Sequence, residues 1–211
     1  MLTDKRARLR AKPGLTTPFN GPATVLANDR EMVFPHTPTI AYSRQVGWGS
    51  YDLPHTNYQP LYWQQTRSPN IQVTALFTNT TPEEHEYTNA CLHFLRVCSL
   101  GHFGINDPLR GSPPPVLEFS AYGANQFANV PVCIGSVSYT LDSDVDYVEQ
   151  TSGRNTTGTG VNNNQLDDSL VLPAQLFVAI DLMYQPNLTD MRETFTAQDI
   201  ANGSLLTQGF L

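Results

Sequence analysis

The most constraining feature of the sequence is an alternating segment followed at once by a helix start. Residues 70–78 place Ile71, Val73, Ala75 and Phe77 on one face and polar side chains on the other. This period of two is typical of a half-buried strand. After it, Thr81 is a good N-cap, Pro82 suits the first helical position, and Glu84 completes a capping box. The sequence therefore predicts a strand over 70–78 and a helix from Pro82.

The predicted helix carries one apolar stripe. Its apolar residues follow at steps of three and four: Tyr87, Ala90, Cys91, Phe94, Leu95 and Cys98. A stripe of this width packs against a sheet, and Gly101 or Gly104 is expected to end the helix. We expect a helix–sheet core built from Tyr87, Cys91, Phe94 and Leu95 of the helix and from Leu117 and Phe119 of a following strand.

Further elements follow the helix. Strands are predicted at 116–122, directly after three prolines, at 130–141 and at 170–184. Residues 150–169 are rich in Gly and Asn and indicate a flexible polar loop, and Thr196 is positioned to cap a short helix through Ala201. One main helix on an antiparallel sheet is the α+β class.

The first third of the chain has a different character. It holds eight of the 16 prolines and both tryptophans. Proline at this density disfavours helices and paired strands, whereas disordered linkers lack such aromatic content. We therefore interpret residues 1–66 as an extended arm rich in proline and aromatic residues, and residues 67–211 as the folded domain.

Charge is scarce and unevenly distributed. Charged residues make up 15% of the chain, against about 25% in a typical soluble domain, which suggests that much of the surface is covered by something else. The first dozen residues carry a net charge of +4. Because the whole chain carries −7, the remaining residues together carry −11. A body this acidic is a poor candidate for coating nucleic acid. The basic N-terminus is expected to be a solvated or partner-contacting tail.

Several other classes are disfavoured. No apolar stretch approaches 18 residues, so no membrane-spanning helix is expected. The N-terminal charges are not followed by an apolar segment, so we expect no secretory signal. The three cysteines are odd in number and lie in apolar patterns, which disfavours a disulfide scaffold.

Two segments contain residue types that bind metal ions. Zinc binding would require Cys91, His93, Cys98 and His102, but their spacing is not that of paired zinc ligands, and the cysteines lie on the core stripe. His85 and His93 are expected on the flank of the helix, as solvated or hydrogen-bonded histidines. The acidic run 142–146 opens like a calcium loop but lacks the required glycine and closing glutamate. A looser cation site there stays an alternative to an acceptor-rich turn.

Motifs for catalysis are missing from the sequence. It contains no nucleophile elbow, P-loop, dinucleotide fingerprint or HExxH segment. Glu118 and Asp181, each on the polar side of a predicted strand, are the one candidate carboxylate pair. Solvated acids on a sheet face are the simpler interpretation, so we expect no enzymatic activity, no cofactor and no bound metal.

From about Thr37 to the C-terminus, the sequence resembles the tail-tube-fold proteins of long-tailed bacteriophages. Within them it is most similar to the baseplate proteins of contractile tails that initiate the inner tube. The segment 111–123, with its three prolines and following strand, is the most specific match. The other matching segments are 58–73, 81–96, 130–134, 144–147 and 195–205. Residues 1–30 and the loop after Gln150 match no pattern of this family.

The resemblance implies a homohexameric ring. The sheets of six subunits would form a closed barrel with helices outside, which would also remove the exposed sheet edges of a lone subunit. The polar sheet face would line a lumen through which DNA passes, with Gln72, Thr74, Glu118, Ser120 and Asp181 as the lumen-facing residues. Trp48, Tyr58 and Trp63 would anchor the arm on a neighbouring subunit.

The resemblance also implies partners and a location. The ring would seed tube assembly at the junction of tube and baseplate, contacting tube subunits, the baseplate hub and other baseplate proteins, but no membrane. It would be assembled in the host cytoplasm and end in the virion. The alternatives are a main tail tube subunit or tail terminator ring, and, in another class, a hub-associated peptidoglycan hydrolase.

Overall fold

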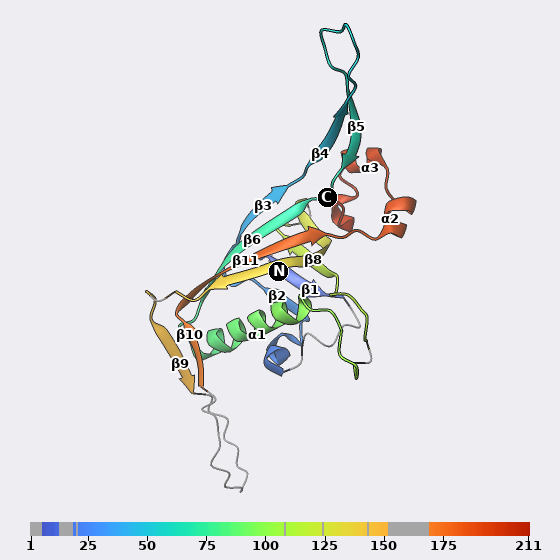
Figure 1. Ribbon diagram of the computed structural model, residues 1–211. Helices are drawn as coiled ribbons and strands as arrows, with labels where there is room; N and C mark the ends of the chain where they lie inside the picture. The colour runs from blue at the N-terminus through green and yellow to red at the C-terminus, as the bar shows by residue number, and fades with distance from the viewer. Residues whose placement is uncertain are drawn as a thin grey trace.

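Alternating side chains along the chain produce one dominant antiparallel sheet (Figure 1). The computed structural model describes residues 6–12, 19, 21–107, 109–123, 125–142, 144–151 and 169–211. The sheet has the strand order β2-β1-β7-β8-β11-β6-β3. Its strands are β1 (Arg8–Ala11), β2 (Glu31–Val33), β3 (Thr39–Ser43), β6 (Asn70–Thr78), β7 (Leu117–Ala121), β8 (Phe127–Thr140) and β11 (Gln175–Tyr184).

Two separate hairpins and several helices complete the α+β fold. The hairpins pair β4 (Val46–Ser50) with β5 (Leu61–Thr66) and β9 (Tyr147–Thr151) with β10 (Ser169–Pro173). The helices are α1 (Pro82–Cys98), α2 (Leu188–Glu193) and α3 (Ala197–Ala201), with 3-10 turns η2 (Gly21–Leu26) and η3 (Leu206–Gln208).

The predicted capping box of α1 is confirmed. The Thr81 hydroxyl accepts a hydrogen bond from the Glu84 amide at 3.3 Å, and the Glu84 carboxylate accepts one from the Thr81 amide. The helix ends earlier than predicted, at Cys98 rather than at Gly101 or Gly104, because Ser99 caps it. The Ser99 amide and hydroxyl both donate to the carbonyl of Arg96, at 3.3 and 2.7 Å.

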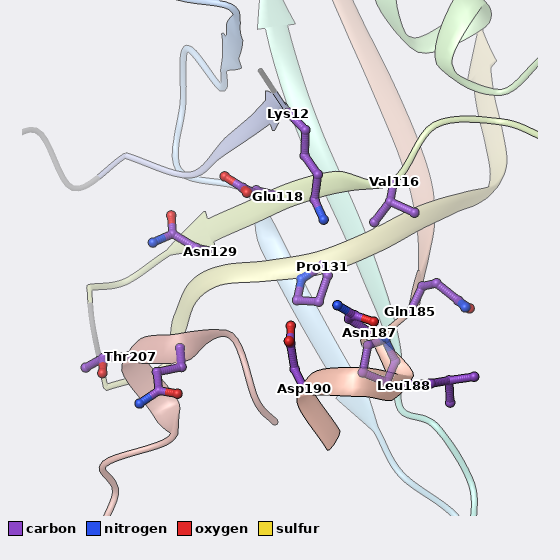
Figure 2. A pocket seen from close by; sticks show the side chains of 12 residues that line it. Lys12, Val116, Glu118, Asn129, Pro131, Gln185, Asn187, Leu188, Asp190 and Thr207 are labelled. Carbon is purple, nitrogen blue, oxygen red and sulfur yellow. The ribbon is translucent and has the colours of Figure 1, made fainter. Parts of the chain in front are cut away.

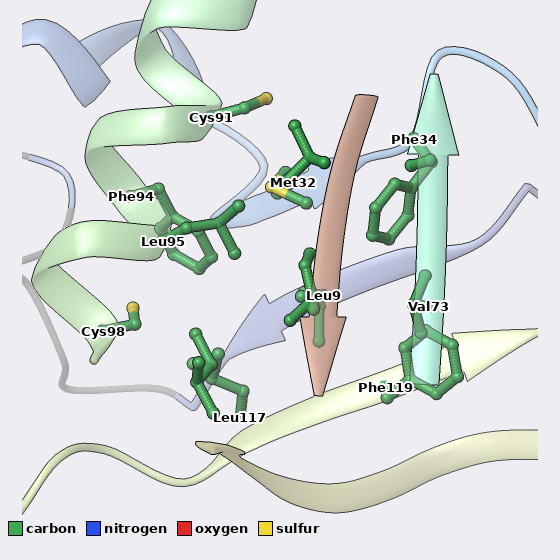
Figure 3. Close-up of a cluster of buried hydrophobic side chains, with 14 of the residues drawn as sticks. Leu9, Met32, Phe34, Val73, Cys91, Phe94, Leu95, Cys98, Leu117 and Phe119 are labelled. Carbon is green, nitrogen blue, oxygen red and sulfur yellow. The ribbon is translucent and has the colours of Figure 1, made fainter. Parts of the chain in front are cut away.

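The predicted helix–sheet core is largely confirmed (Figure 3). The stripe of α1 packs on one face of the sheet. Five of the six residues predicted for the helix–sheet core are fully buried: Cys91, Phe94 and Leu95 of α1, and Leu117 and Phe119 of β7. Tyr87 is only partly buried, and its hydroxyl contacts the backbone of β2. The helix therefore closes the core and also reaches the edge of the sheet.

The sheet curls around this core. Its two edge strands, β2 and β3, are joined by residues 34–38 alone, a path of at most about 21 Å between Val33 and Thr39. A flat seven-stranded sheet would separate its edges by about 29 Å. The fully buried Phe34 within this connection shows that it crosses the core side of the sheet. The opposite face is consequently convex.

The prediction of a separate arm over residues 1–66 is wrong for most of its length. Strands β1, β2 and β3 belong to the main sheet, and Leu9, Met32 and Phe34 are fully buried. These strands have three to five residues, too few to show a clear period. Only the β4–β5 segment of the predicted arm projects from the domain (Figure 1).

The predicted strand over 170–184 is divided in two. At Ala174 the backbone leaves one sheet for the other. Its amide donates to the carbonyl of Asp146, while its own carbonyl accepts from the Asn79 amide, at 2.8 and 2.9 Å. β10 therefore pairs with β9, and only β11 joins the main sheet. The predicted loop over 150–169 overlaps these strands at its ends, since residues 150–151 belong to β9 and residue 169 to β10. Residues 152–168 lie outside the described part of the chain.

Candidate functional site

The convex face of the sheet carries all five residues predicted to line a lumen. Three of them form a cluster on β6 and β11, where Asp181 lies opposite Gln72 and Thr74 opposite Ala179. The Asp181 carboxylate accepts a hydrogen bond from Ser136 of β8 at 2.6 Å. This part of the face therefore carries polar side chains, with one carboxylate held by a neighbouring hydroxyl, beside the exposed Phe177 and Met183.

The other two predicted residues lie apart from this cluster. Glu118 and Ser120 are on β7, and their cross-strand neighbours on β1 are Arg10 and Arg8. Both arginines form ion pairs with the nearly buried Glu31 of β2, at 2.9 and 3.1 Å. This second cluster therefore mixes charges of both signs.

Sequence reasoning missed the two arginines because it assigned them to a solvated tail. The alternation of Arg8, Leu9, Arg10 and Ala11 is the signal for a strand with its cations on one face. It spans only four residues, which is why the strand was not predicted.

Glu118 and Asp181 are not placed as a hydrolytic pair. Glu118 lies opposite Pro131 of β8 and Asp181 opposite Ser136 of the same strand. The two acids are thus offset along β8 by about 16 Å at the rise of a strand. The carboxylates of a glycoside hydrolase lie about 5–9 Å apart, so these two do not share one bound sugar.

The β4–β5 hairpin exposes an unusual amount of aromatic surface. Trp48, Tyr58 and Trp63, the predicted anchors, are exposed by 58%, 86% and 60%. Trp48 lies opposite Trp63, and the rings of Tyr51 and Tyr62 are 4.6 Å apart. The hairpin is therefore held by its own cross-strand aromatic pairs.

Gly49 allows one of these rings to lie flat on the backbone. A Cβ atom at this position would stand 2.4 Å from the Tyr62 ring. Any larger residue at 49 would displace that ring, so glycine is needed for the arrangement of the exposed aromatic surface.

The two hairpins leave the sheet at opposite ends (Figure 1). The β4–β5 hairpin extends from β3 and β6 at the end of the sheet where Asn70 of β6 pairs with Met183 of β11. β9–β10 precedes β11 at the other end, where Gln175 lies opposite Thr78. Each end of the domain thus presents a projecting two-stranded element.

A hollow of about 540 Å³ lies between β7, β8 and the C-terminal segment (Figure 2). Glu118 and Asn129 line it from the sheet, Lys12 follows β1, and Asp190 lies on α2. The C-terminal segment approaches β8 closely at Gly209, where a Cβ atom would stand 2.6 Å from the Asn129 carbonyl oxygen. The hollow combines one cation, two carboxylates and several amides, which is no arrangement specific to one ligand.

The zinc hypothesis fails on burial. Cys91 and Cys98 are fully buried in the core, where desolvation raises the pKa of Cys91 and raises that of Cys98 to about 12. His102 instead pairs with Asp107 at 2.7 Å. Within the described residues, no three His, Cys, Asp or Glu side chains are grouped to hold a metal ion. This finding covers the acidic run 142–146, except for residue 143, which lies outside the described residues.

In the described part of the chain, His85 is neither solvated nor hydrogen-bonded, in contrast to the expectation. It is buried at 1% exposure, and neither ring nitrogen has a hydrogen-bond partner among the described residues. The helix therefore turns this side chain inward with the core stripe. His93 is partly buried.

Comparison with protein-family models and with curated proteins found no match to this sequence. In the described part of the chain, no helix is long and apolar enough to cross a membrane.

Proposed function

We propose that this protein has the tail-tube fold and is a structural subunit of a bacteriophage tail. Six copies form a ring at the junction of tube and baseplate, and the ring seeds the tube. It requires no catalysis or cofactor. Its partners are other copies of itself, tube subunits and baseplate proteins, and DNA passes through the lumen without being held.

The observation that carries this proposal is the pair of hairpins at opposite ends of the sheet. An isolated two-stranded hairpin is marginally stable in water, and β4–β5 exposes Trp48 and Trp63 on it. Aromatic patches of this kind are typical of protein interfaces. Contacts at both ends of one domain suit subunits that stack head to tail.

The convex face supports a role as the wall of a DNA channel. On β6 and β11 it carries Gln72, Thr74 and Asp181, none of them cationic. The two arginines of β1 share ion pairs with Glu31, and a second carboxylate, that of Glu118, lies on the strand opposite Arg10. Passing phosphates would therefore meet few uncompensated positive charges, and it is such charges that hold DNA.

Electron microscopy of the purified full-length protein tests the proposal. We expect rings with a central opening, either alone or after mixing with the tube and baseplate proteins of the same phage. Long tubes formed by this chain alone would favour the main tube subunit instead. Monomers that form no ring even beside those partners would contradict the proposal.

A further inference from the structure

In the edge strand β2, the backbone groups of alternate residues face away from its partner β1. In the β1–β2 pair, the Phe34 amide donates to the Ala7 carbonyl and the Ala11 amide to the Arg30 carbonyl, at 2.9 and 3.0 Å. Because antiparallel bonding alternates along a strand, the amide and carbonyl of Val33 point away from β1. These are the groups with which an edge strand binds another strand.

One hydroxyl occupies both of these groups. The Tyr87 hydroxyl of α1 accepts a hydrogen bond from the Val33 amide at 2.9 Å and donates one to the Val33 carbonyl at 2.6 Å. Burial raises the pKa of Tyr87, so the hydroxyl keeps its proton and can act as donor and acceptor together. Val33 is therefore saturated without a neighbouring strand.

In the described part of the chain no strand fills the space beside this edge, and η2 borders it with Val25 and Leu26. A hollow of about 330 Å³ lies there, and its lining includes Asp29, Glu31, Val33 and Tyr87. No other strand of the described sheet pairs with β2 on this side. Among the described residues, the Tyr87 hydroxyl is what occupies the pairing groups of Val33.

We propose that Tyr87 prevents the β2 edge from accepting a strand of a second copy of this chain. An exposed edge would otherwise allow two copies to pair edge to edge. Tyr87 thereby leaves β3, whose residues are mostly exposed, as the edge open to pairing. This inference holds for a monomer as well as for a ring, so it does not depend on the proposed function.

Hydrogen exchange and the assembly state of Tyr87→Phe test this inference. The variant keeps the ring in place but frees the amide and carbonyl of Val33. We expect exchange of the Val33 amide to accelerate about tenfold. Analytical ultracentrifugation should show additional, concentration-dependent dimers.

Two further variants separate this effect from general destabilisation. Tyr139→Phe removes the hydroxyl of another partly buried tyrosine, which bonds to the Arg96 side chain and not to an edge, and should leave association unchanged. Adding Val33→Pro to Tyr87→Phe removes the outward donor, and should abolish the new dimers.

The inference is overturned if Tyr87→Phe associates no more than the wild type, or if Tyr139→Phe associates equally. The wild type provides a test that needs no variant to fold. Its Val33 amide should exchange as slowly as that of Phe34, which bonds to β1, and exchange at the rate of an exposed amide would refute the inference.

Discussion

At the scale of single residues, burial separates aromatic side chains of similar size into two roles. Phe94 is fully buried and stacks on Phe19 with ring centroids 5.6 Å apart. Phe103, nine residues later, is 92% exposed. The first contributes to folding, whereas the second has no core to join within the described chain.

Phe94→Ala should lower the free energy of unfolding by about 3–5 kcal/mol, because it removes a buried ring and leaves a cavity. Urea unfolding followed by circular dichroism measures this. Phe103→Ala is the matched control and should change stability by no more than about 0.5 kcal/mol. A loss below about 1 kcal/mol for Phe94→Ala would mean that the helix stripe does not form the core.

At the scale of elements, α1 depends on the charge of its first turn. The Glu84 carboxylate accepts hydrogen bonds from the Thr80 hydroxyl and amide at 2.7 and 2.9 Å. These bonds, the hydroxyl first, hold the pKa of Glu84 below its ordinary value of 4.5. Ionised Glu84 therefore stabilises the folded state, and this contribution is present above pH 4.5 and lost as the pH falls through the lowered pKa.

Glu84→Gln should accordingly destabilise the protein at neutral pH, and the difference from wild type should shrink as the pH falls below 4.5. Thermal unfolding measured between neutral and acidic pH gives this difference. Glu86→Gln, a change on the exposed side of the same helix, controls for the loss of one negative charge. A wild-type advantage that grows towards acid would refute the assigned role of the cap.

At the scale of the whole molecule, the domain consists of a curled sheet with a closed core, to which β9–β10 contributes Leu172 and outside which β4–β5 projects. Trp48 and Trp63 pair with each other across β4–β5 and do not belong to the buried core cluster. Stability and assembly should therefore respond to different mutations, which makes the two separable in experiments.

Trp48→Ser combined with Trp63→Ser should leave the unfolding temperature of the domain nearly unchanged and abolish stacking or ring formation. Electron microscopy and sedimentation measure assembly, and calorimetry measures stability. Leu100→Ser with Phe103→Ser, which removes exposed apolar side chains from a different loop, is the control. Unchanged assembly in the tryptophan variant would show that the hairpin is not an interface.

Elements whose periodicity runs over many residues were predictable from local patterns. The nine residues of β6 and the 17 of α1 each repeat their pattern often enough to define a buried face, which is why Cys91 and Phe94 were predicted as core. The capping box was predictable because all of its groups lie within five residues of one another.

The partners of the short strands depend on contacts between distant parts of the chain. β1 and β2 join the sheet because β7 offers a partner 106 residues or more away in the chain, and four or three residues do not encode that choice. Other long-range contacts were equally unpredictable. They place Arg8 and Arg10 on the strand beside Glu118, move the backbone from one sheet to the other at Ala174, and bond Val33 to Tyr87. Local patterns fix which face of an element is buried, whereas its partner depends on contacts between residues distant in the sequence.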